Sequence, residues 1–456
     1  MTERKIPSDD LTLPQYEPLQ IRNLKTAMSS VAMLEILRGK WPYLKRSGSI
    51  LTDFKVVRVY PRKGRDFLFV YEIRLLDDAG ERVEHLFGEL VGAEAEKRYE
   101  ELQEKLKKTR RKQFSRTKQT DVLSCIPELG LIIRFSGIDE KLNGMRMIYK
   151  PSAFIPILER CLPLNGEKVS GCEVKVLRHR LGKRCIFRVH FNSSESVTGK
   201  KTGHSIIGKV YPNRGDRGER VFSVMRGLWE NGFSDRSVDG IRIPKPLLYL
   251  PDIQMLLMED VPGSYWDSLN LQGIEPSIGA AGKTLAKLHR SSFKVPGRHT
   301  VDDEMELLRD HWIIITSQVY PELKASLENA LSKVRNALEK CRSFVPQLVH
   351  RDYYEKQVLV NGPQSILIDF DTLCLSDPAI DVGNFLAHIK LAGLQNPGNV
   401  QLLEEVFLSS YNTKISREFS SRIEAYTSSS LLRLACLYSL WPKWRHLVKP
   451  LINCVP

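Results

Sequence analysis

Two short apolar runs in the C-terminal third of the chain place acidic and amide side chains at their ends. The first run leads into His350 and Asp352, and Gln357 follows five residues after that aspartate. The second run ends in Asp369 and Asp371. An aspartate that faces a hydroxyl, followed by an amide and a second aspartate that hold metal ions, is the layout that phosphoryl transfer needs. Each short motif also arises by chance, but their ordered combination predicts a phosphotransferase site.

Each of these side chains has an expected role in such a site. Asp352 would accept or orient the proton of the substrate hydroxyl, and its main work would be positioning. Asp369 would bind Mg²⁺, because hard cations take carboxylate oxygens, and the amide oxygen of Gln357 is a neutral hard ligand for a second position. Asp371 either supports the metal site or has a structural role. His350 is expected to brace the turn rather than transfer protons.

The composition fits a multidomain globular protein. A chain of 456 residues is too long for one core. Its net charge of +14 suits polyanionic partners, of which ATP is one and nucleic acid another. No apolar run approaches the roughly 20 residues of a membrane span, and the N-terminus lacks a signal-peptide core. The eight cysteines form no Cys-x-x-Cys motif. We therefore expect reduced thiols, a cytoplasmic location and no membrane contact; the sequence does not indicate an oligomeric state.

The N-terminal third predicts a helix followed by an antiparallel sheet. Residues 1–28 are polar and punctuated by prolines, which is typical of a loosely attached lead-in. Residues 29–150 then form the first predicted unit. Its expected elements are a helix near 31–37, strands at 57–60 and 67–73 joined by a turn at Gly64, a strand at 85–91, a helix over 93–108 and a strand at 131–135.

Residues 151–262 repeat that order. The expected elements are a helix over 152–161, strands at 174–177 and 185–191 joined at Gly182, a strand at 205–211, a helix over 218–229 and a strand at 254–258. The hairpin glycines Gly64 and Gly182 are 118 residues apart, and the third-strand glycines Gly88 and Gly208 are 120 apart. This spacing favours a degenerate internal duplication. The alternative is that both halves share only a common plan of a helix and an antiparallel sheet.

The two predicted units differ at one position that matters for phosphate binding. Lys209 follows the third-strand glycine of the second unit, whereas Glu89 occupies that place in the first. A lysine neutralises phosphate oxygens and a glutamate repels them. Only the second unit is therefore expected to hold ATP, and the first is expected to be a scaffold or cap.

Residues 263–456 are expected to be mainly helical. Helices over 305–341 would wall the substrate. The acidic residues Asp302, Asp303 and Glu304 either attract a cationic acceptor or form a solvated helix start. The densest positive run, residues 105–118, is either a solvated helix end or a docking site for an anionic substrate or nucleic acid.

Residues 151 to about 390 resemble the aminoglycoside phosphotransferase and choline kinase-like family. The motifs that carry the resemblance are Ile207-Gly-Lys209, Leu256-Leu-Met-Glu-Asp-Val-Pro-Gly263, Leu285-Ala-Lys-Leu-His289, His350-Arg-Asp352, Ile368-Asp369-Phe370 and Asp377-Pro-Ala-Ile-Asp381. The resemblance implies an α+β, two-lobed, protein-kinase-like fold. Its small antiparallel-sheet lobe at 151–262 would bind ATP, and its larger helical lobe at 263–456 would carry the catalytic and substrate site. A degenerate duplicate of the small lobe would precede them at 29–150.

The resemblance also implies roles for residues around the nucleotide. Lys209 would contact the α- and β-phosphates, held in place by a helix glutamate, for which Glu219 is the better candidate. Backbone amides of the turn at Gly182 would cover the phosphates, and the backbone at Glu259 and Val261 would pair with the adenine edge. Gln357 stands where the family commonly has asparagine, and it resembles maltokinase-like members in this respect.

The sequence therefore predicts an ATP- and Mg²⁺-dependent kinase that phosphorylates a hydroxyl of a small molecule, such as a sugar, an aminoglycoside or an amino alcohol. A protein substrate is less expected, because no Ala-Pro-Glu motif follows Ile368-Asp-Phe370. Residues 371–377 also leave no room for a long activation loop. A catalytically silent kinase-like binding protein is one alternative, motivated by Gln357 and the single glycine of the hairpin turn. A nucleic-acid-binding protein is the other, but residues 105–118 lack interleaved aromatic residues.

Overall fold

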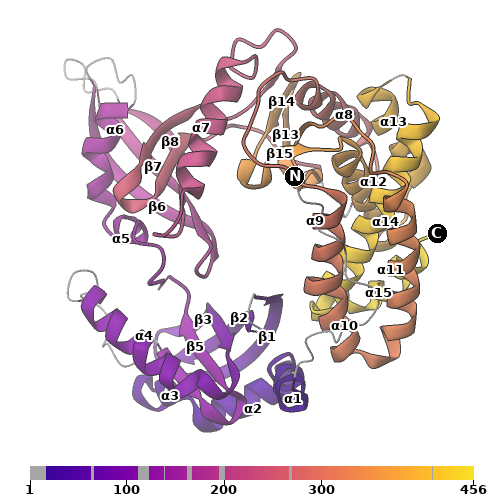
Figure 1. The fold of residues 1–456 in the computed structure, drawn as a ribbon. Helices are drawn as coiled ribbons and strands as arrows, with labels where there is room; N and C mark the ends of the chain where they lie inside the picture. Colours follow the sequence, from indigo (N-terminus) through magenta and orange to yellow (C-terminus); the bar gives the residue numbers. More distant parts are fainter. Residues whose placement is uncertain are drawn as a thin grey trace, which may run out of the picture.

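The computed structural model describes residues 17–62, 66–110, 123–137, 139–161, 167–194, 201–266, 270–412 and 414–456. Residues 1–16 of the expected lead-in, Gly64, and residues 111–118 of the basic run lie outside this part. The described chain forms an N-terminal unit, a small lobe and a large helical lobe, all visible in Figure 1. No described helix is both long enough and apolar enough to cross a membrane.

The N-terminal unit is a five-stranded antiparallel sheet with helices on both faces. Its sheet order is β1-β2-β3-β5-β4. In β2, alternate side chains enter the core, and these include Phe69, Tyr71 and Ile73. The elements are α1 (Pro18–Ala27), α2 (Ser30–Lys40), α3 (Pro42–Ser47), β1 (Ile50–Pro61), β2 (Phe67–Asp77), β3 (Gly80–Leu90), α4 (Ala95–Arg110), β4 (Leu123–Ile126) and β5 (Leu131–Phe135).

The small lobe contains a second five-stranded sheet with the same strand order. Counted from its first strand, the order is β6-β7-β8-β11-β10, which repeats that of the N-terminal unit. Gly208 in β8 lies under the ring of Phe187, whose Cζ would be 2.0 Å from an added Cβ, so only glycine fits there. The elements are α5 (Met145–Ile148), α6 (Ile155–Cys161), β6 (Lys168–Arg180), β7 (Arg184–Ser194), β8 (Lys201–Val210), α7 (Arg217–Glu230), β10 (Pro246–Leu250) and β11 (Met255–Glu259).

The large lobe is mainly helical, with short strands at its border with the small lobe. Strand β12 (Gln347–Val349) pairs with β15 (Cys374–Ser376), and β13 (Val358–Asn361) pairs with β14 (Gln364–Leu367), which also pairs with β9 (Ile241–Arg242). The main helices are α8 (Glu275–His289), α9 (Val301–Glu306), the π-helical η6 (Leu307–Ile313), α10 (Ile314–Val319), α11 (Lys324–Glu339), α12 (Ala379–Gln395), α13 (Val400–Tyr411), α14 (Arg417–Ser439), η10 (Pro442–Leu447) and α15 (Val448–Asn453).

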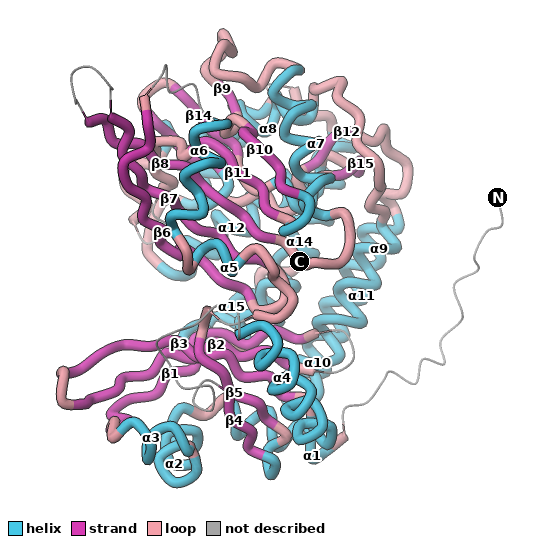
Figure 2. Tube along the Cα trace, turned by 90° about the vertical axis from the view of Figure 1, so that its left-hand side faces the viewer, coloured by secondary structure: helices cyan, strands magenta, loops and turns pink. Residues whose placement is uncertain are grey.

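The N-terminal unit contacts both lobes. Its sheet lies below the small-lobe sheet in Figure 2, with α2 and α3 on its far side. Leu181, at the tip of the β6–β7 hairpin, is buried against Leu68 and Phe87 of the N-terminal sheet. On the large-lobe side, Trp441 Nε1 donates a hydrogen bond to the carbonyl oxygen of Val59 at 3.3 Å. The unit is therefore a bridge between the two lobes.

The α+β fold class expected from the sequence, with a small antiparallel lobe and a larger helical lobe, is confirmed. The boundaries of β5 match those of the strand expected at 131–135. Strands β4 and β10 were missed because they are short and lack a clear alternation of apolar residues. Helix α14 begins at Arg417, and the side chain of Ser416 caps it by accepting a hydrogen bond from the amide of Phe419.

Candidate active site

The turn after β12 is held in place by the carboxylate of Asp381. The backbone amides of His350 and Arg351 each donate a hydrogen bond to this carboxylate at 2.6 Å. His289 Nε2 lies 3.0 Å from the same group. Arg351 has a φ of 66°, a left-handed conformation that is costly for a side chain with a Cβ. Asp381 therefore holds the strained turn that presents Asp352.

Asp352 lies beside the expected metal ligands. Gln357 is buried, and its Nε2 is 3.5 Å from Asp352 Oδ2. Burial raises the pKa of Asp352, the nearby carboxylate of Asp369 adds to this effect, and Arg433 and His350 oppose it. The structure thus brings Asp352, Gln357 and Asp369 together, as the sequence predicted for a catalytic aspartate and two metal ligands.

Asp369 lies directly after the end of β14, in a left-handed conformation with a φ of 66°. His350 Nε2 lies 2.9 Å from the carbonyl oxygen of Ile368, which fixes the backbone just before it. His350 was expected to brace the turn, and this contact joins the turn to the backbone of Ile368.

Two cations of the small lobe meet the carboxylates of Asp369 and Asp371. Lys209 Nζ is 2.9 Å from an oxygen of each aspartate. Arg184 contacts both Asp369 oxygens, at 3.2 and 3.1 Å, and also pairs with Asp371. Burial alone would raise the pKa of Asp369, but Lys209 and Arg184 hold it well below its usual range. This is a compact cluster of two acids and two bases across the boundary between the lobes.

The expected ion pair between Lys209 and Glu219 is absent from the described residues. Glu219 is exposed in the first turn of α7. That turn packs on the rings of Tyr249 and Tyr211, close to the α-carbon of Gly218, so it does not point its acid toward β8. Asp371 takes the expected place of the helix glutamate instead.

The amide of Gly182 is already occupied by a carboxylate. Gly182 has the positive φ of 66° that its turn requires, and its N–H donates to Asp139 Oδ2 at 2.6 Å. Arg62 of the N-terminal unit donates to the carbonyl oxygen of Leu181 at 2.8 Å. The turn expected to cover phosphates is therefore fastened to the N-terminal unit and to the segment that follows it.

In the segment between the lobes, the backbone amides of the two positions expected to contact adenine differ. The amide of Glu259 donates to the carbonyl oxygen of Lys245 at 2.9 Å, so this donor is already used. The Glu259 carboxylate pairs with Arg242 at 2.7 Å. The amide of Val261 forms no backbone hydrogen bond within the described residues, and it remains the candidate adenine contact.

The acidic residues at the start of α9 make contacts within the large lobe. Asp302 pairs with Arg342 at 2.7 Å, and Asp303 caps the helix at Thr300. Glu304 is buried and accepts a hydrogen bond from Ser429 at 2.6 Å.

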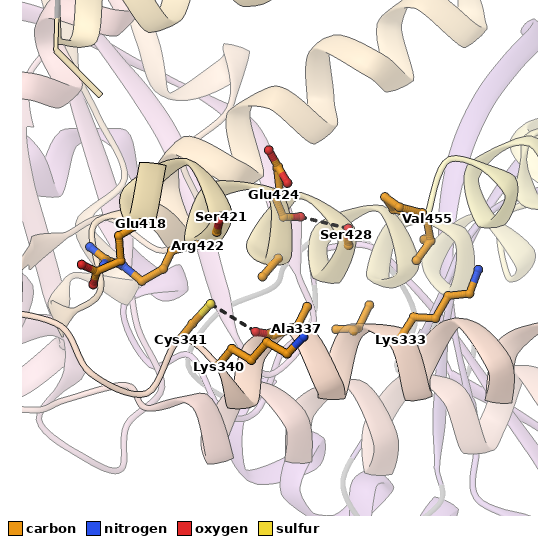
Figure 3. A pocket seen from close by; sticks show the side chains of 13 residues that line it. Lys333, Ala337, Lys340, Cys341, Glu418, Ser421, Arg422, Glu424, Ser428 and Val455 are labelled. Carbon is orange, nitrogen blue, oxygen red and sulfur yellow. Dashed lines mark hydrogen bonds and ion pairs between the residues drawn. The ribbon is translucent and has the colours of Figure 1, made fainter. Parts of the chain in front are cut away.

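A hollow of about 390 Å³ lies between α11 and α14 near the C-terminus (Figure 3). It is lined by residues such as Lys333, Cys341 and Arg422. None of the expected catalytic, metal or nucleotide residues lines it. The hollow is therefore lined in part by the helices expected to wall the substrate, but by none of the residues expected to carry the chemistry.

Sequence reasoning missed Arg184 and Tyr211. The hydroxyl of Tyr211 donates to Asp371 Oδ1 at 2.9 Å. One signal was available for each residue. Arg184 begins the strand after the Gly182 turn, and Tyr211 lies two residues after Lys209, on the same face of a strand.

Residues 197–403 match the model of the phosphotransferase enzyme family, and this range contains Lys209, Asp352 and Asp369. This part of the chain is therefore similar to that family. Comparison with curated protein sequences found no match.

Solved structures of kinases are similar to part of this chain. A choline/ethanolamine kinase family protein from Mesorhizobium loti is 15% identical, with 59% of this chain and 83% of that chain covered and a TM-score of 0.42. Spectinomycin phosphotransferase, solved with ADP and spectinomycin, is 14% identical, with 63% and 87% covered and a TM-score of 0.45. Choline kinase from Cryptosporidium parvum is 16% identical, with 67% and 94% covered and a TM-score of 0.46.

Proposed function

We propose that this protein is an ATP- and Mg²⁺-dependent kinase that transfers the γ-phosphoryl group to a hydroxyl of a small molecule. The observation that carries the proposal is the meeting of Lys209 and Asp369 at 2.9 Å, with Asp352 beside them. A phosphate-binding cation, a metal-binding carboxylate and a hydroxyl-orienting carboxylate are the three groups that phosphoryl transfer requires of the protein.

The residues present fit a magnesium ion that bridges phosphates. Asp369 and Gln357 offer hard oxygen ligands. The described residues contain no cluster of three or more His, Cys, Asp or Glu side chains arranged for a metal. Mg²⁺ is commonly held by one or two protein groups, with phosphates and water completing its shell. The ion would neutralise charge on the phosphates, and Lys209 and Arg184 would exchange their carboxylate contacts for phosphate oxygens.

The chain's own groups would then orient the acceptor. Asp352 receives the hydroxyl proton or holds it in line with the phosphorus, and Asp381 keeps the strained turn beneath it rigid. Sugars, aminoglycosides and amino alcohols are the proposed classes of acceptor. We place the reaction in the cytoplasm, which the unpaired state of the described cysteines supports. Residues 29–150 are proposed as a duplicated, disabled small lobe that serves as a cap.

Glu89 supports this view of the N-terminal unit. It occupies the place of Lys209 and is buried in ion pairs with Arg62, at 2.9 Å, and with Arg134. The carboxylate of Glu89 and the two guanidinium groups thus fill the part of the N-terminal unit that corresponds to the phosphate site proposed for the small lobe.

Isothermal calorimetry with Mg-ATP tests the proposal. The wild type should bind, and Lys209→Ala should bind at least about tenfold more weakly, because a charge-assisted contact is lost. Lys175→Ala, at an exposed position on β6, is the matched control and should bind like the wild type. Absence of binding by the folded wild type would end the kinase proposal and favour a protein that keeps the fold without its chemistry.

A further inference from the structure

Three parts of the chain converge on a small group of arginine and aromatic side chains. Arg180, the last residue of β6, lies with its guanidinium carbon 4.7 Å from the ring centre of Tyr60 in β1. Arg58 donates to the hydroxyl of Tyr60 at 3.4 Å. The guanidinium of Arg58 also lies 5.3 Å from the ring centre of Trp441 in the large lobe. The N-terminal unit therefore completes a surface that neither lobe forms alone.

This surface lies on the Asp352 side of the catalytic cleft between the lobes. Arg180 is close enough to Asp352 for the aspartate to raise the pKa of Arg180, which burial and neighbouring arginines lower. Burial raises the pKa of Tyr354, and Arg178, two residues before Arg180 on β6, opposes that rise. Tyr354 follows Asp352 in the catalytic turn and stacks on His388 with ring centres 4.7 Å apart.

The cations of this surface lack a carboxylate partner. Within the part of the chain that the structure describes, neither Arg178 nor Arg180 forms an ion pair, and the side-chain hydrogen bond of Arg58 goes to a neutral hydroxyl. The nearby carboxylate of Glu355 faces His388 at 3.4 Å. Arg58 and Arg180 are half-buried, whereas Arg178 is exposed. A half-buried cation without a counter-ion is costly, and a bound anion removes that cost.

These cations are separate from those expected to hold the nucleotide. Lys209 and Arg184 contact Asp369 and Asp371, the metal-side carboxylates. Arg180 turns instead toward Tyr60 of the N-terminal unit. Arg180 and Arg184 are cross-strand partners in the β6–β7 hairpin, so the two sets of cations lie next to each other but have different partners.

We propose that Arg58, Arg178 and Arg180, with Tyr60, bind a phosphate or carboxylate group of the acceptor, so that the substrate is an anionic hydroxyl compound. This inference rests on the proposed kinase function, and among its acceptor classes it favours phosphorylated or acidic sugars over the cationic aminoglycosides and amino alcohols. In the reaction, a bond forms between the acceptor hydroxyl oxygen and the γ-phosphorus, and the bond from that phosphorus to the β–γ bridging oxygen breaks. The electron pair leaves with ADP, and the hydroxyl proton passes to Asp352. The N-terminal unit thereby selects the substrate by its charge.

Calorimetric titration in saturating Mg-ADP tests this inference with matched pairs of probes: glycerol 3-phosphate against glycerol, glucose 6-phosphate against glucose, and gluconate against glucose. In at least one pair, the charged member should bind about tenfold or more tightly than the neutral one, and added salt should weaken it. Arg180→Gln and Arg58→Gln should each weaken that binding about tenfold. Arg74→Gln, on β2 and paired with Glu81, is the control.

The outcomes distinguish binding of an acceptor anion from binding of the ATP phosphates. Mg-ATP affinity should be unchanged in Arg180→Gln, and a loss of nucleotide binding instead would assign these cations to ATP and overturn the inference. Equal binding of the charged and neutral members of all pairs by a wild type that binds Mg-ATP would also overturn it, while the kinase proposal would stand. A wild type that does not bind Mg-ATP would remove both. Arg58→Lys, which keeps the charge, should retain most of the binding, and thermal unfolding checks that each variant is folded.

Discussion

Lys209 Nζ lies 2.9 Å from Asp369 Oδ1, and this ion pair joins a strand of the small lobe to the loop that follows β14 of the large lobe. Arg184 makes a parallel connection to Asp369 at 3.1 Å. The lobes are therefore held together by the same charges that a metal-bound nucleotide needs. Nucleotide binding would replace carboxylate contacts of these cations by phosphate contacts, and it would do so without leaving either cation buried and unpaired.

Replacing Lys209 by methionine should remove the phosphate contact while keeping most of the side-chain volume. The carboxylates of Asp369 and Asp371 would then share Arg184. We expect kcat/KM for ATP to fall by about 10²-fold, the usual effect of removing one preorganised charge from a phosphoryl-transfer site. ADP release, measured at steady state with an acceptor that the wild type phosphorylates, provides the test.

Lys175→Met is the matched control for this change, because Lys175 is exposed on β6 and away from both aspartates. Its kcat/KM should stay within about twofold of the wild-type value. Equal activities of Lys209→Met and Lys175→Met would show that Lys209 has no part in nucleotide use.

Asp352→Asn should abolish transfer and leave Mg-ATP binding largely intact, because the role proposed for Asp352 is to orient the acceptor hydroxyl and not to contact the nucleotide. Burial raises the pKa of Asp352. Its carboxylate must be ionised to orient the hydroxyl, so activity should fall as the pH drops through this raised pKa. The acid limb of kcat should therefore lie at higher pH than an exposed aspartate would give. A pH–rate profile that is unaffected by the Asn substitution would contradict this role.

Glu304 should stabilise the large lobe mainly above pH 4.5. Burial opposes its ionisation, but His299, Arg433 and Ser429 lower its pKa from 4.5 to about 2. A carboxyl whose folded-state pKa is depressed contributes stability above its unfolded pKa, and this is lost as the pH falls toward the folded value. The contribution is about 3 kcal/mol at neutral pH. Urea unfolding of Glu304→Gln against wild type at pH 7 and pH 3 measures it, with exposed Glu322→Gln as control. A difference that does not shrink at pH 3 would refute this origin.

Local patterns allowed part of the site to be predicted. Asp352, Gln357 and Asp369 come from one stretch whose strands and turn are short, so their spacing alone brings them together. Lys209 could be placed because a glycine and alternating apolar residues define its strand. The partners of Lys209 could not, since Asp369 and Asp371 follow it by 160 and 162 residues. Whether Glu219 can reach Lys209 depends on the orientation of α7, which is set by the packing of Gly218 on two tyrosine rings.

The N-terminal unit shows the same limit. Its hairpins and helices could be read from apolar alternation, and Glu89 already indicated that it lacks a phosphate site. Its placement against the β6–β7 tip depends on contacts such as the hydrogen bond from Arg62 to Leu181, which are 119 residues apart. No local pattern reports such a contact, so the cation surface around Arg180 emerges only from the folded chain.

The hydrogen bond from Gly182 to Asp139 should contribute to the stability of this junction. Asp139 is buried and accepts from the amides of Gly182, at 2.6 Å, and Lys141, at 2.9 Å, and it lies 3.0 Å from His179 Nε2. Burial alone would raise the pKa of Asp139, but the contacts with His179 and the Gly182 amide lower it. Replacing the aspartate by alanine leaves these donors without their acceptor and should cost about 1–3 kcal/mol.

Hydrogen exchange measured by mass spectrometry can locate that loss. In Asp139→Ala, exchange should accelerate in the peptide that contains Gly182 and in the adjoining ends of β6 and β7, while peptides of α12 should exchange as in the wild type. Asp78→Asn, at an exposed position after β2, is the control and should change neither region. Because the pKa of Asp139 is depressed, the difference between wild type and Asp139→Ala should be full at neutral pH and should shrink as the pH falls below that of an ordinary aspartate. An unchanged Gly182 peptide in the folded variant would show that Asp139 does not hold the turn.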